Sequence, residues 1–430
     1  MVRVARIASR MSSPLSIPEN TIREGVERFG TPFWVYDRAT IENRIREVQV
    51  FDVVRYAQKA CSNLSILSLM KKKGVVVDAV SAGEIERALR VGYVGGETKQ
   101  TPQIVYTADI FDADALALVK KHHIQVNVGS PDMILQLADA GVKSDLTLRV
   151  NPGFGHGHSR KTNTGGPLSK HGVWYTQIKE CMKLAQSRGM WISGLHMHIG
   201  SGTDFEHLTQ VCDAMCDAAR PLGSHIRTIS AGGGLPIPYH EEDKHNRIDV
   251  NEYFKCWNKA RKSIEQAVGH SISLEVEPGR YLVAESGLLV TEIRAVKQVE
   301  NNTFYLVDAG FTDLVRPAFY GSYHQISVIS RDGRSLDKDA DVIIAGPLCE
   351  SGDVFTQEEG GFVVTRKLPE AKVGDLLVLH DTGAYGAAMS SNYNSRRYAP
   401  ELLFSEGKLE LIRERQSFDH LFANERIIAL

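Results

Sequence analysis

One pattern of apolar and polar positions repeats along the middle of the chain, from about residue 50 to 280. A short β-branched or apolar run is followed by a stretch in which apolar residues recur every three or four positions, as on one face of a helix. AGEIERALRVGY (82–93) and EHLTQVCDAMCDAARPLG (206–223) are two such stretches. The repeat predicts strands that alternate with helices, which is typical of a parallel sheet with crossover helices.

Eight strands are expected in this region. Their runs are VVRYAQKA (53–60), VVVDAVS (75–81), QIVYTAD (103–109), IQVNVGS (124–130), DLTLRVNPG (145–153), WISGLHMHIGS (191–201), IRTISAGGG (226–234) and ISLEVEPGR (272–280). Eight is the number of strands at which a parallel sheet closes around a filled interior. We therefore predict a (β/α)8 TIM barrel over residues 40–283.

The pattern changes after residue 280. The runs GLLVTEIRAVKQV, NTFYLVDAG, DVIIAGPLC and DLLVLHDTG are separated by turns without helix-length inserts. They predict an all-β domain, either a β-sandwich or a β-barrel. TPFWVYD (31–37) is one more strand ahead of the barrel, and we expect it to join this domain. Residues 1–39 and 284–430 would then form the β-domain, and the fold class would be α/β plus all-β.

Composition narrows the possible functions. The 430 residues are 43% hydrophobic and 24% charged, as in an ordinary globular protein with room for two domains. A net charge of −2 gives no sign of a nucleic-acid partner or an anionic membrane surface, and no apolar run is long enough to cross a bilayer. The six cysteines are scattered, which favours a reducing cytoplasm. We interpret the basic first eleven residues as an upstream start ahead of Met11 rather than a transit peptide.

Polar residues stand at the carboxyl ends of the predicted strands, where barrels of this kind carry out their chemistry. The strand ends contribute Lys59, Asp78, Asp109, Asn127, Arg149, His196 with His198, Gly232 to Gly234, and Glu277 with Arg280. Structural need does not explain why polar groups from all eight strands converge on one rim. We expect a functional site there.

Lys59 and Glu277 stand at the first and the eighth strand ends. An isolated lysine would more simply lie across the rim with its ammonium in water. A lysine desolvated near other cations has a lowered pKa, and its amine forms Schiff bases. A carboxylate beside a pyridine nitrogen keeps that nitrogen protonated, although Glu277 could instead form a buried ion pair with Arg280. The pair of positions favours a covalently held cofactor.

Two glycine-rich turns follow neighbouring strands. AGGGL (231–235) exposes backbone N–H groups that an anion can approach closely, and HIGSG (198–202) adds a hydroxyl at Ser201. A glycine-rich turn by itself needs no ligand. Two of them on the sixth and seventh strands resemble a phosphate cradle.

HMH (196–198) permits a different reading, because an HxH pair at a strand end is also found in barrel metallohydrolases. Such sites need further ligands on later strands, and here those strands end in GGG and EPGR. His156, His158 and His171 lie in a Gly/Lys/Thr-rich loop that is better suited to closing over a substrate. We therefore predict no metal, and we expect His198 to stack on an aromatic cofactor.

Six motifs occur together in a familiar order: YAQKA, HMHIGSG, the triple glycine, EPGR, CESGDVF (349–355) and HDTGAY (380–385). From about residue 20 to 425, the chain resembles the pyridoxal-phosphate decarboxylases of the alanine-racemase-like fold, and among them the diaminopimelate decarboxylases. The resemblance implies a carboxy-lyase that uses pyridoxal 5'-phosphate. It would convert meso-2,6-diaminopimelate to L-lysine and CO2, the last step of lysine biosynthesis. It also implies a cytoplasmic homodimer with active sites shared between subunits.

The resemblance assigns roles at the matching positions. Cofactor contacts are implied for Lys59, Asp78, His198, Ser201, Gly233, Gly234, Glu277, Gly279, Arg280 and Tyr385. Substrate contacts are implied for Arg280, Arg316, Tyr320, Glu350 and Tyr385. Lys59 would hold the cofactor, and Cys349 would donate a proton from a stretch that reaches into the neighbouring subunit's site.

The residues themselves agree with these roles. A cysteine at an apolar strand end is more often an inert core residue, but the glutamate after Cys349 makes an exposed turn more plausible. An arginine with a tyrosine close by suits a carboxylate, and Glu350 suits an ammonium. Such a pocket would fit a substrate that has an amino-acid group at both ends.

Other functions remain open on the sequence. Decarboxylases of ornithine, arginine or carboxynorspermidine share the cofactor residues, but the ornithine type has Asp after the cysteine. Glu350 and Arg316 favour a substrate with a distal carboxylate. The CESGD motif and the long β-domain disfavour a racemase. A non-catalytic cofactor-binding homologue should have lost Lys59 or Cys349, and the metal-dependent hydrolase is the remaining alternative.

Overall fold

The computed structural model describes residues 15–96, 101–155, 164–198 and 205–429. The chain divides into two compact units. Residues 42–237 and 247–282 form one, called here the barrel unit, and residues 1–41, 238–246 and 283–430 form the other, called the sheet unit. None of the helices in the described ranges is both long and apolar enough to span a bilayer.

The barrel unit contains a closed parallel sheet. Its strands are β2 (Val53–Ala57), β3 (Val76–Ala79), β4 (Ile104–Tyr106), β5 (Gln125–Val128), β6 (Asp145–Asn151), β8 (Trp191–His196), β9 (Thr228–Ser230) and β10 (Ser273–Val276). Neighbours pair in parallel in this order, and the pairing of β10 with β2 closes the ring. A two-residue strand, β7 (Val173–Trp174), pairs with the end of β6. Each of the eight predicted runs contains one barrel strand, so the TIM barrel is confirmed.

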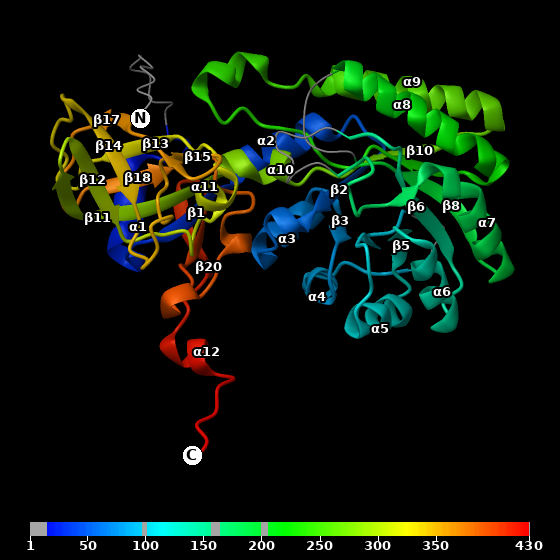
Figure 1. Ribbon diagram of the computed structural model, residues 1–430, viewed down its shortest axis with the longest axis horizontal. Helices are drawn as coiled ribbons and strands as arrows, with labels where there is room; N and C mark the ends of the chain where they lie inside the picture. The colour runs from blue at the N-terminus through cyan, green and yellow to red at the C-terminus, as the bar shows by residue number, and fades with distance from the viewer. Residues whose placement is uncertain (1–14, 97–100, 156–163, 199–204, 430) are drawn as a thin grey trace. The chain divides into compact units, whose positions relative to one another are not determined.

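Helices connect the strands of the barrel. They are α2 (Arg38–Val48), α3 (Leu64–Lys72), α4 (Ala82–Arg90), α5 (Ala113–His122), α6 (Pro131–Asp139), α7 (Ile178–Ser187), α8 (Phe205–Ala219), α9 (Val250–Val268) and α10 (Arg280–Val283). Figure 1 shows α4 to α7 on the outside of the strands. Side chains of Ser81, Asp112 and Ser130 accept first-turn backbone N–H groups, so local sequence fixes where three of these helices begin.

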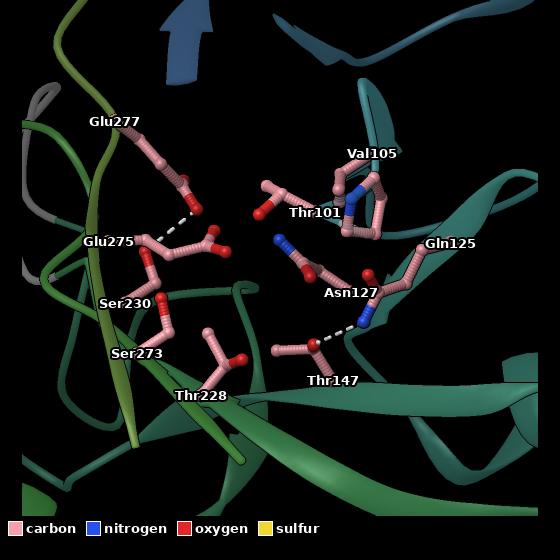
Figure 2. A pocket seen from close by; sticks show the side chains of 11 residues that line it. Thr101, Val105, Gln125, Asn127, Thr147, Thr228, Ser230, Ser273, Glu275 and Glu277 are labelled. Atoms are coloured by element: carbon pink, nitrogen blue, oxygen red, sulfur yellow. Dashed lines mark hydrogen bonds between the residues drawn. The ribbon is translucent and has the colours of Figure 1, made fainter. Parts of the chain in front are cut away.

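The interior of the barrel is polar. Along β10, Leu274 and Val276 are buried among apolar residues, whereas the alternate residues Ser273, Glu275 and Glu277 line a cavity of about 200 Å³. Hydroxyl and amide side chains from β5, β6 and β9 complete much of its wall (Figure 2). Barrels of this class are usually filled by branched apolar side chains. This interior therefore has room for polar side chains to move or to be hydrated.

The sheet unit contains one mixed sheet. Its strands are β1 (Phe33–Asp37), β11 (Gly287–Val299), β12 (Asn302–Val307), β13 (Ile326–Ile329), β14 (Asp339–Ala345), β17 (Arg366–Pro369), β18 (Leu376–Leu379), β19 (Glu401–Ser405) and β20 (Lys408–Arg413). Most pairs are antiparallel, but β1 runs parallel to β19 and β12 parallel to β14. β15 (Gln357–Glu358) and β16 (Phe362–Val363) form a separate hairpin. A separate β-domain is confirmed, and it is a mixed sheet.

The core of the sheet unit forms around its N-terminal elements. The five residues of β1 are all buried, because this strand lies between β11 and β19. Ile22 and Val26 on α1 (Glu19–Phe29) pack with Phe33 and Leu402 in one apolar cluster. Two short helices, α11 (Arg316–Tyr320) and α12 (Phe418–Phe422), complete the unit.

Candidate active site

Lys59 lies on a 3-10 turn, η1 (Gln58–Ala60), that directly follows β2. Its side chain is exposed, whereas Gln58 and Ala60 on either side of it are buried. The sequence predicted Lys59 at the end of a buried strand, but the residue is exposed. The reason is that the strand ends at Ala57 and Lys59 belongs to the short turn after it. The amine is open to solvent at the carboxyl end of β2.

Glu277 lies just beyond β10 and is only 5% exposed. Its Oε2 is 2.7 Å from His196 Nε2, and its Oε1 accepts a hydrogen bond of 2.8 Å from Ser230 Oγ. Burial alone would raise the pKa of Glu277, but His196, Ser230 and the charge of Arg55 lower it to about 2. The carboxyl group is therefore an anion at neutral pH. The predicted alternative, an ion pair with Arg280, is not among its contacts in the described chain.

Asp78, the predicted neighbour of Lys59, is buried near the carboxyl end of β3, one residue before Ala79. Burial and the negative charge of Glu277 raise its pKa to about 6, although the charge of Lys59 opposes this. Within the described part of the chain, its Oδ1 has no hydrogen-bond partner. A buried oxygen without a partner is costly, so this atom is suited to accept a hydrogen bond from a bound molecule or from the lysine amine.

Glu84 is a carboxyl group near Lys59 that was not predicted. It lies in the first turn of α4, where Ser81 Oγ accepts its backbone N–H and its own Oε2 accepts the N–H of Val80. Burial raises its pKa to about 7, and the charge of Asp78 adds to the effect. The sequence signal was present, because serine followed three residues later by glutamate marks a capping box.

The triple glycine lies against His198. The N–H of Gly233 donates to His198 Nδ1 at 2.8 Å, and a Cβ on Gly233 would come within 2.6 Å of the Glu277 carbonyl oxygen. Gly232 and Gly234 have φ angles of 62° and 97°, a region that favours glycine. Burial, together with the charges of Arg149 and Lys59, holds the pKa of His198 well below its ordinary value. The imidazole is thus neutral, as a ring that stacks on an aromatic group would be.

The EPGR turn lies close to the turn that carries Lys59. A Cβ on Gly279 would come within 3.0 Å of the carbonyl oxygen of Ala57 and 3.3 Å of Ala60 Cβ, so glycine allows this approach. Arg280 begins α10 and is partly buried. Ser201, together with His156 and His158, lies outside the described residues.

The CESGD motif forms an exposed turn after β14 in the sheet unit. The backbone N–H of Cys349 donates to Asn394 Oδ1 at 3.0 Å, and Tyr393 Oη donates to Glu350 Oε1 at 2.5 Å. Both Cys349 and Glu350 are exposed, as their sequence context predicted. The turn therefore presents a thiol and a carboxylate at its surface.

The anchor of this turn is Asp353, which is buried. Its carboxylate accepts the backbone N–H groups of Phe311 at 2.7 Å and Leu348 at 2.8 Å. The same carboxylate would clash with a Cβ on Gly346, so the backbone at the start of the turn comes very close to it. Asp353 was not predicted, and its place in CESGD was the only signal.

The remaining predicted substrate residues also belong to the sheet unit. Arg316 is buried on α11, and its guanidinium donates to Tyr239 Oη at 2.7 Å and to Ser322 Oγ at 3.2 Å. Tyr320 ends the same helix and is partly exposed. Tyr385 is also partly exposed and has a φ of 58°, a strained value for a tyrosine. The contact with Tyr239 had no signal in the sequence.

The two histidines of the HxH pair have separate partners, since His196 contacts Glu277 and His198 accepts from Gly233. His171 lies 2.7 Å from Asp109 instead. In the described ranges, no group of three or more His, Cys, Asp or Glu side chains is arranged to hold a metal ion.

Arg55 and Glu275 form a buried ion pair inside the barrel that the sequence analysis missed. Arg55 Nη2 lies 3.0 Å from Glu275 Oε2, and the two residues are 1% and 8% exposed. The signal was the alternation of polar and apolar residues in ISLEVE, which places Glu275 on the same side of the strand as Glu277. Within this pair, the positive charge of Arg55 also acts on Glu277 and helps to lower its pKa.

Residues 38–284 match the family model described as the pyridoxal-binding domain of pyridoxal-dependent decarboxylases. Diaminopimelate decarboxylase of Escherichia coli (strain K12) is 54% identical over 409 residues, which cover 95% of this chain and 96% of that protein. The enzyme of the same name from Streptomyces coelicolor is 52% identical over 420 residues, which cover 97% and 94%.

Solved structures give the same result. A crystal structure of a diaminopimelate decarboxylase superposes with a TM-score of 0.91 at 53% identity, covering 96% of this chain and 98% of that one. The diaminopimelate decarboxylase from Helicobacter pylori, crystallised with L-lysine, superposes with a TM-score of 0.82 at 30% identity, covering 94% and 98%.

Proposed function

Because the chain belongs to the pyridoxal-dependent decarboxylases, and within them to the diaminopimelate decarboxylases, we propose that it converts meso-2,6-diaminopimelate to L-lysine and CO2. The observation that carries this proposal is the buried carboxylate of Glu277, which is kept anionic by two hydrogen bonds. A cation at a ring nitrogen is what such a group would stabilise.

The residues present fit pyridoxal 5'-phosphate. The barrel rim offers an accessible primary amine at Lys59, a fixed anion at Glu277 and a neutral imidazole at His198. Gly233 packs tightly against the Glu277 carbonyl group and donates its N–H to His198, so this turn holds both residues in place. When bound, pyridoxal phosphate takes up the electron pair left by departing CO2 into its protonated ring.

We assign the roles of the barrel residues on this basis. Lys59 would hold the cofactor through its amine, and Asp78 would accept a hydrogen bond close to that amine. Glu277 would hold a proton at the ring nitrogen, and His198 would stack on the ring. Backbone groups of Gly234, Gly279 and Arg280, with Ser201 and with Tyr385 of the sheet unit, would bind the phosphate, whereas the N–H of Gly233 is donated to His198.

The sheet unit would supply the groups that act on the substrate. Arg316 would bind the distal carboxylate with Tyr320 and Tyr385, and Glu350 would bind the distal ammonium. Arg280 of the barrel unit would also contact the substrate. The Cys349 thiol would give its proton to the carbon atom that has lost CO2, which completes the replacement of a C–C bond by a C–H bond. Discrimination against ornithine would come from Arg316, because a buried arginine loses a charge-assisted hydrogen bond when the distal carboxylate is missing.

We further propose that Cys349 and Glu350 act in the site of a second copy of the chain, so that the enzyme is a homodimer. Both side chains are exposed on a turn, and the buried carboxylate of Asp353 fixes the backbone of this turn through hydrogen bonds. An exposed thiol beside an exposed carboxylate has little structural use on a free surface. A cytoplasmic location agrees with the free state of all six cysteines.

The assay that tests the proposed function compares CO2 release from meso-diaminopimelate, ornithine, arginine and carboxynorspermidine by the protein loaded with pyridoxal phosphate. We expect release from meso-diaminopimelate, and much slower release from the others. Borohydride reduction followed by peptide mass spectrometry should find the cofactor on Lys59 and not in Lys59→Ala. Faster release from another substrate, or label on a different lysine, would overturn the assignment.

A mixing experiment tests the shared site. Lys59→Ala and Cys349→Ala should each be inactive alone. If the two subunits share sites, unfolding and refolding an equal mixture should restore about a quarter of the parent activity, because half of the dimers then contain one intact site. A mixture that stays inactive although mixed dimers form would show that each site is built within one chain.

A further inference from the structure

Three neighbouring barrel strands each place one polar group at the same point. His196 ends β8, Ser230 ends β9, and Glu277 follows β10, with β9 between the other two in the sheet. His196 and Ser230 are register partners. All three residues are at least 95% buried. The hydrogen bond between His196 and Glu277 therefore spans a strand, and β9 fills the gap with a short serine side chain.

The two oxygens of Glu277 have different partners. Ser230 donates to Oε1 at 2.8 Å, while Oε2 is 2.7 Å from His196 Nε2. The terminal torsion of a glutamate is soft, so a carboxylate with one partner can still rotate about its last bond. Two partners on two oxygens fix its plane.

Space beside the carboxylate makes this restraint necessary. Figure 2 shows Glu277 directed toward an open region, with Asn127 and Thr101 on the opposite side. The cavity of about 200 Å³ leaves room for the side chain to swing away from the rim. Ser230 alone would not prevent this movement, because it holds only Oε1 and the carboxylate could still turn about that contact.

We propose that His196 is a positioning residue, which holds Glu277 in the orientation and the charge state needed to meet the cofactor's ring nitrogen. The inference rests on the proposed function and adds a residue to it. Nε2 carries the hydrogen that bonds the anion, and Nδ1 has no hydrogen-bond partner in the described chain. The bond to Glu277 is therefore the only hydrogen bond that the imidazole makes in the described chain.

Other charged groups surround the pair and have to be considered in any pH experiment. The charged groups are Arg55 on β2, Lys59 on η1, Asp78 on β3 and Arg149 on β6. The neutral imidazole of His198, which follows β8, also lies nearby. Asp78, with a pKa of about 6, and Glu84, with a pKa of about 7, are nearby carboxyl groups whose charge changes near neutral pH.

The test uses two variants that differ by one methylene. The amide of His196→Gln can reach the place of Nε2, whereas the amide of His196→Asn is too short. Ser230→Ala removes the partner of the other oxygen with little change in volume. All are loaded with pyridoxal phosphate, and thermal unfolding shows whether each is folded.

The readouts are the visible absorbance of the bound cofactor against pH, its dissociation constant, kcat and KM. We expect His196→Asn to shift the absorbance titration and to lower kcat about 10- to 100-fold, because a preorganised donor has been lost. KM should change by less than about threefold, since uniform binding of the substrate is untouched. His196→Gln should restore most of kcat and the parent titration.

An unchanged titration and kcat in folded His196→Asn would overturn the proposal. Equal losses in both histidine variants would also overturn it, because they would indicate packing and not a hydrogen bond. If His196→Asn does not fold, Ser230→Ala decides: His196 still holds Glu277 in that variant, so the proposal requires a titration close to that of the parent, and a large shift would overturn it. Failure of the proposed function would look different, since the parent protein itself would then bind cofactor without releasing CO2 from meso-diaminopimelate.

Discussion

The barrel unit and the sheet unit hold their chemical groups in opposite ways. In the barrel, the carboxylate of Glu277 is buried and bonded through both oxygens to His196 and Ser230. In the sheet unit, Cys349 and Glu350 are exposed, and each has one hydrogen bond to the 393–394 segment.

This difference shows which groups have all of their hydrogen-bond partners within their own unit. Burial removes water from Glu277, so nearby donors change its pKa strongly and the loss of one has a large effect. Around Glu350, water competes for every contact, and the loss of one costs little stability. The orientation and the charge of Glu277 are determined by residues of its own unit. The exposed thiol of Cys349 and carboxylate of Glu350 have few contacts within the sheet unit, so the environment in which they act depends on a molecule that binds there.

The largest effect on stability should come from the barrel interior. Arg55→Met leaves Glu275 buried without its partner, and we expect the free energy of unfolding to fall by about 3–5 kcal/mol. Denaturant unfolding followed by circular dichroism measures it. The matched control is Arg28→Met, which breaks an exposed pair with Glu24 and should cost less than about 1 kcal/mol. Similar losses in both variants would remove the distinction between the two units.

A smaller effect is expected at the buried base of the turn. Asp353→Ala leaves the N–H groups of Phe311 and Leu348 without an acceptor, at a cost of about 1–3 kcal/mol. Asp353→Asn keeps one acceptor oxygen and should lose less. Labelling of Cys349 by a thiol reagent should speed up in Asp353→Ala, because the turn is loosened. An unchanged labelling rate would mean that the turn is held by other contacts.

Glu84 gives a pH-dependent effect of about 1–2 kcal/mol, because solvent screening at this partly exposed residue reduces the roughly 3 kcal/mol that the full pKa shift would give. Its pKa is raised from an unfolded value of 4.5 to about 7, so between these values the folded state binds more protons than the unfolded state. The contribution of Glu84 to the stability of the cofactor-free protein should therefore decrease as pH rises from 4.5 to 7. Glu84→Gln has no such proton, and its stability relative to the parent should increase between pH 5 and pH 8. If the difference in stability between Glu84→Gln and the parent does not vary with pH, the pKa of Glu84 is not raised in the folded protein.

The smallest effect on stability is expected on the exposed turn. Tyr393→Phe removes the donor to Glu350 and should change the free energy of unfolding by less than about 0.5 kcal/mol. Activity is more sensitive, because Glu350 loses its fixed orientation, and kcat/KM should fall about three- to tenfold. Tyr175→Phe, at another exposed tyrosine, is the control and should leave both quantities unchanged. A fall in stability without a fall in activity would reverse our interpretation of the turn.

Local signals explain why the barrel could be predicted. Each strand is a short apolar run, and Ser81, Asp112 and Ser130 mark helix starts that depend only on nearby residues. The rim residues follow from the same frame, since a parallel sheet brings the carboxyl ends of its strands together. Glu277 and the glycines were found in this way.

Partners across the fold could not be predicted, because sequence patterns do not specify them. Arg55 and Glu275 are 220 positions apart, and His196 and Glu277 are 81 apart. The exposure of Lys59 depends on one short turn that has no distinct pattern. The segment 238–246, which brings Tyr239 to Arg316, belongs to the sheet unit although the barrel strands lie on both sides of it in sequence.

The position of β1 has a consequence for synthesis of the protein. Its neighbours are residues 287–290 and 401–404, and Tyr36 donates a hydrogen bond to Glu401, 365 positions later. At ribosomal rates of about 5–20 residues per second, the apolar strand FWVYD would leave the ribosome roughly 20–70 seconds before its last partner. Both of its edges lack native partners until residues 287–290 emerge, and one edge still lacks its partner until residues 401–404 do, which is a hazard for aggregation. The nascent chain is therefore expected to depend on a chaperone until its final strands emerge.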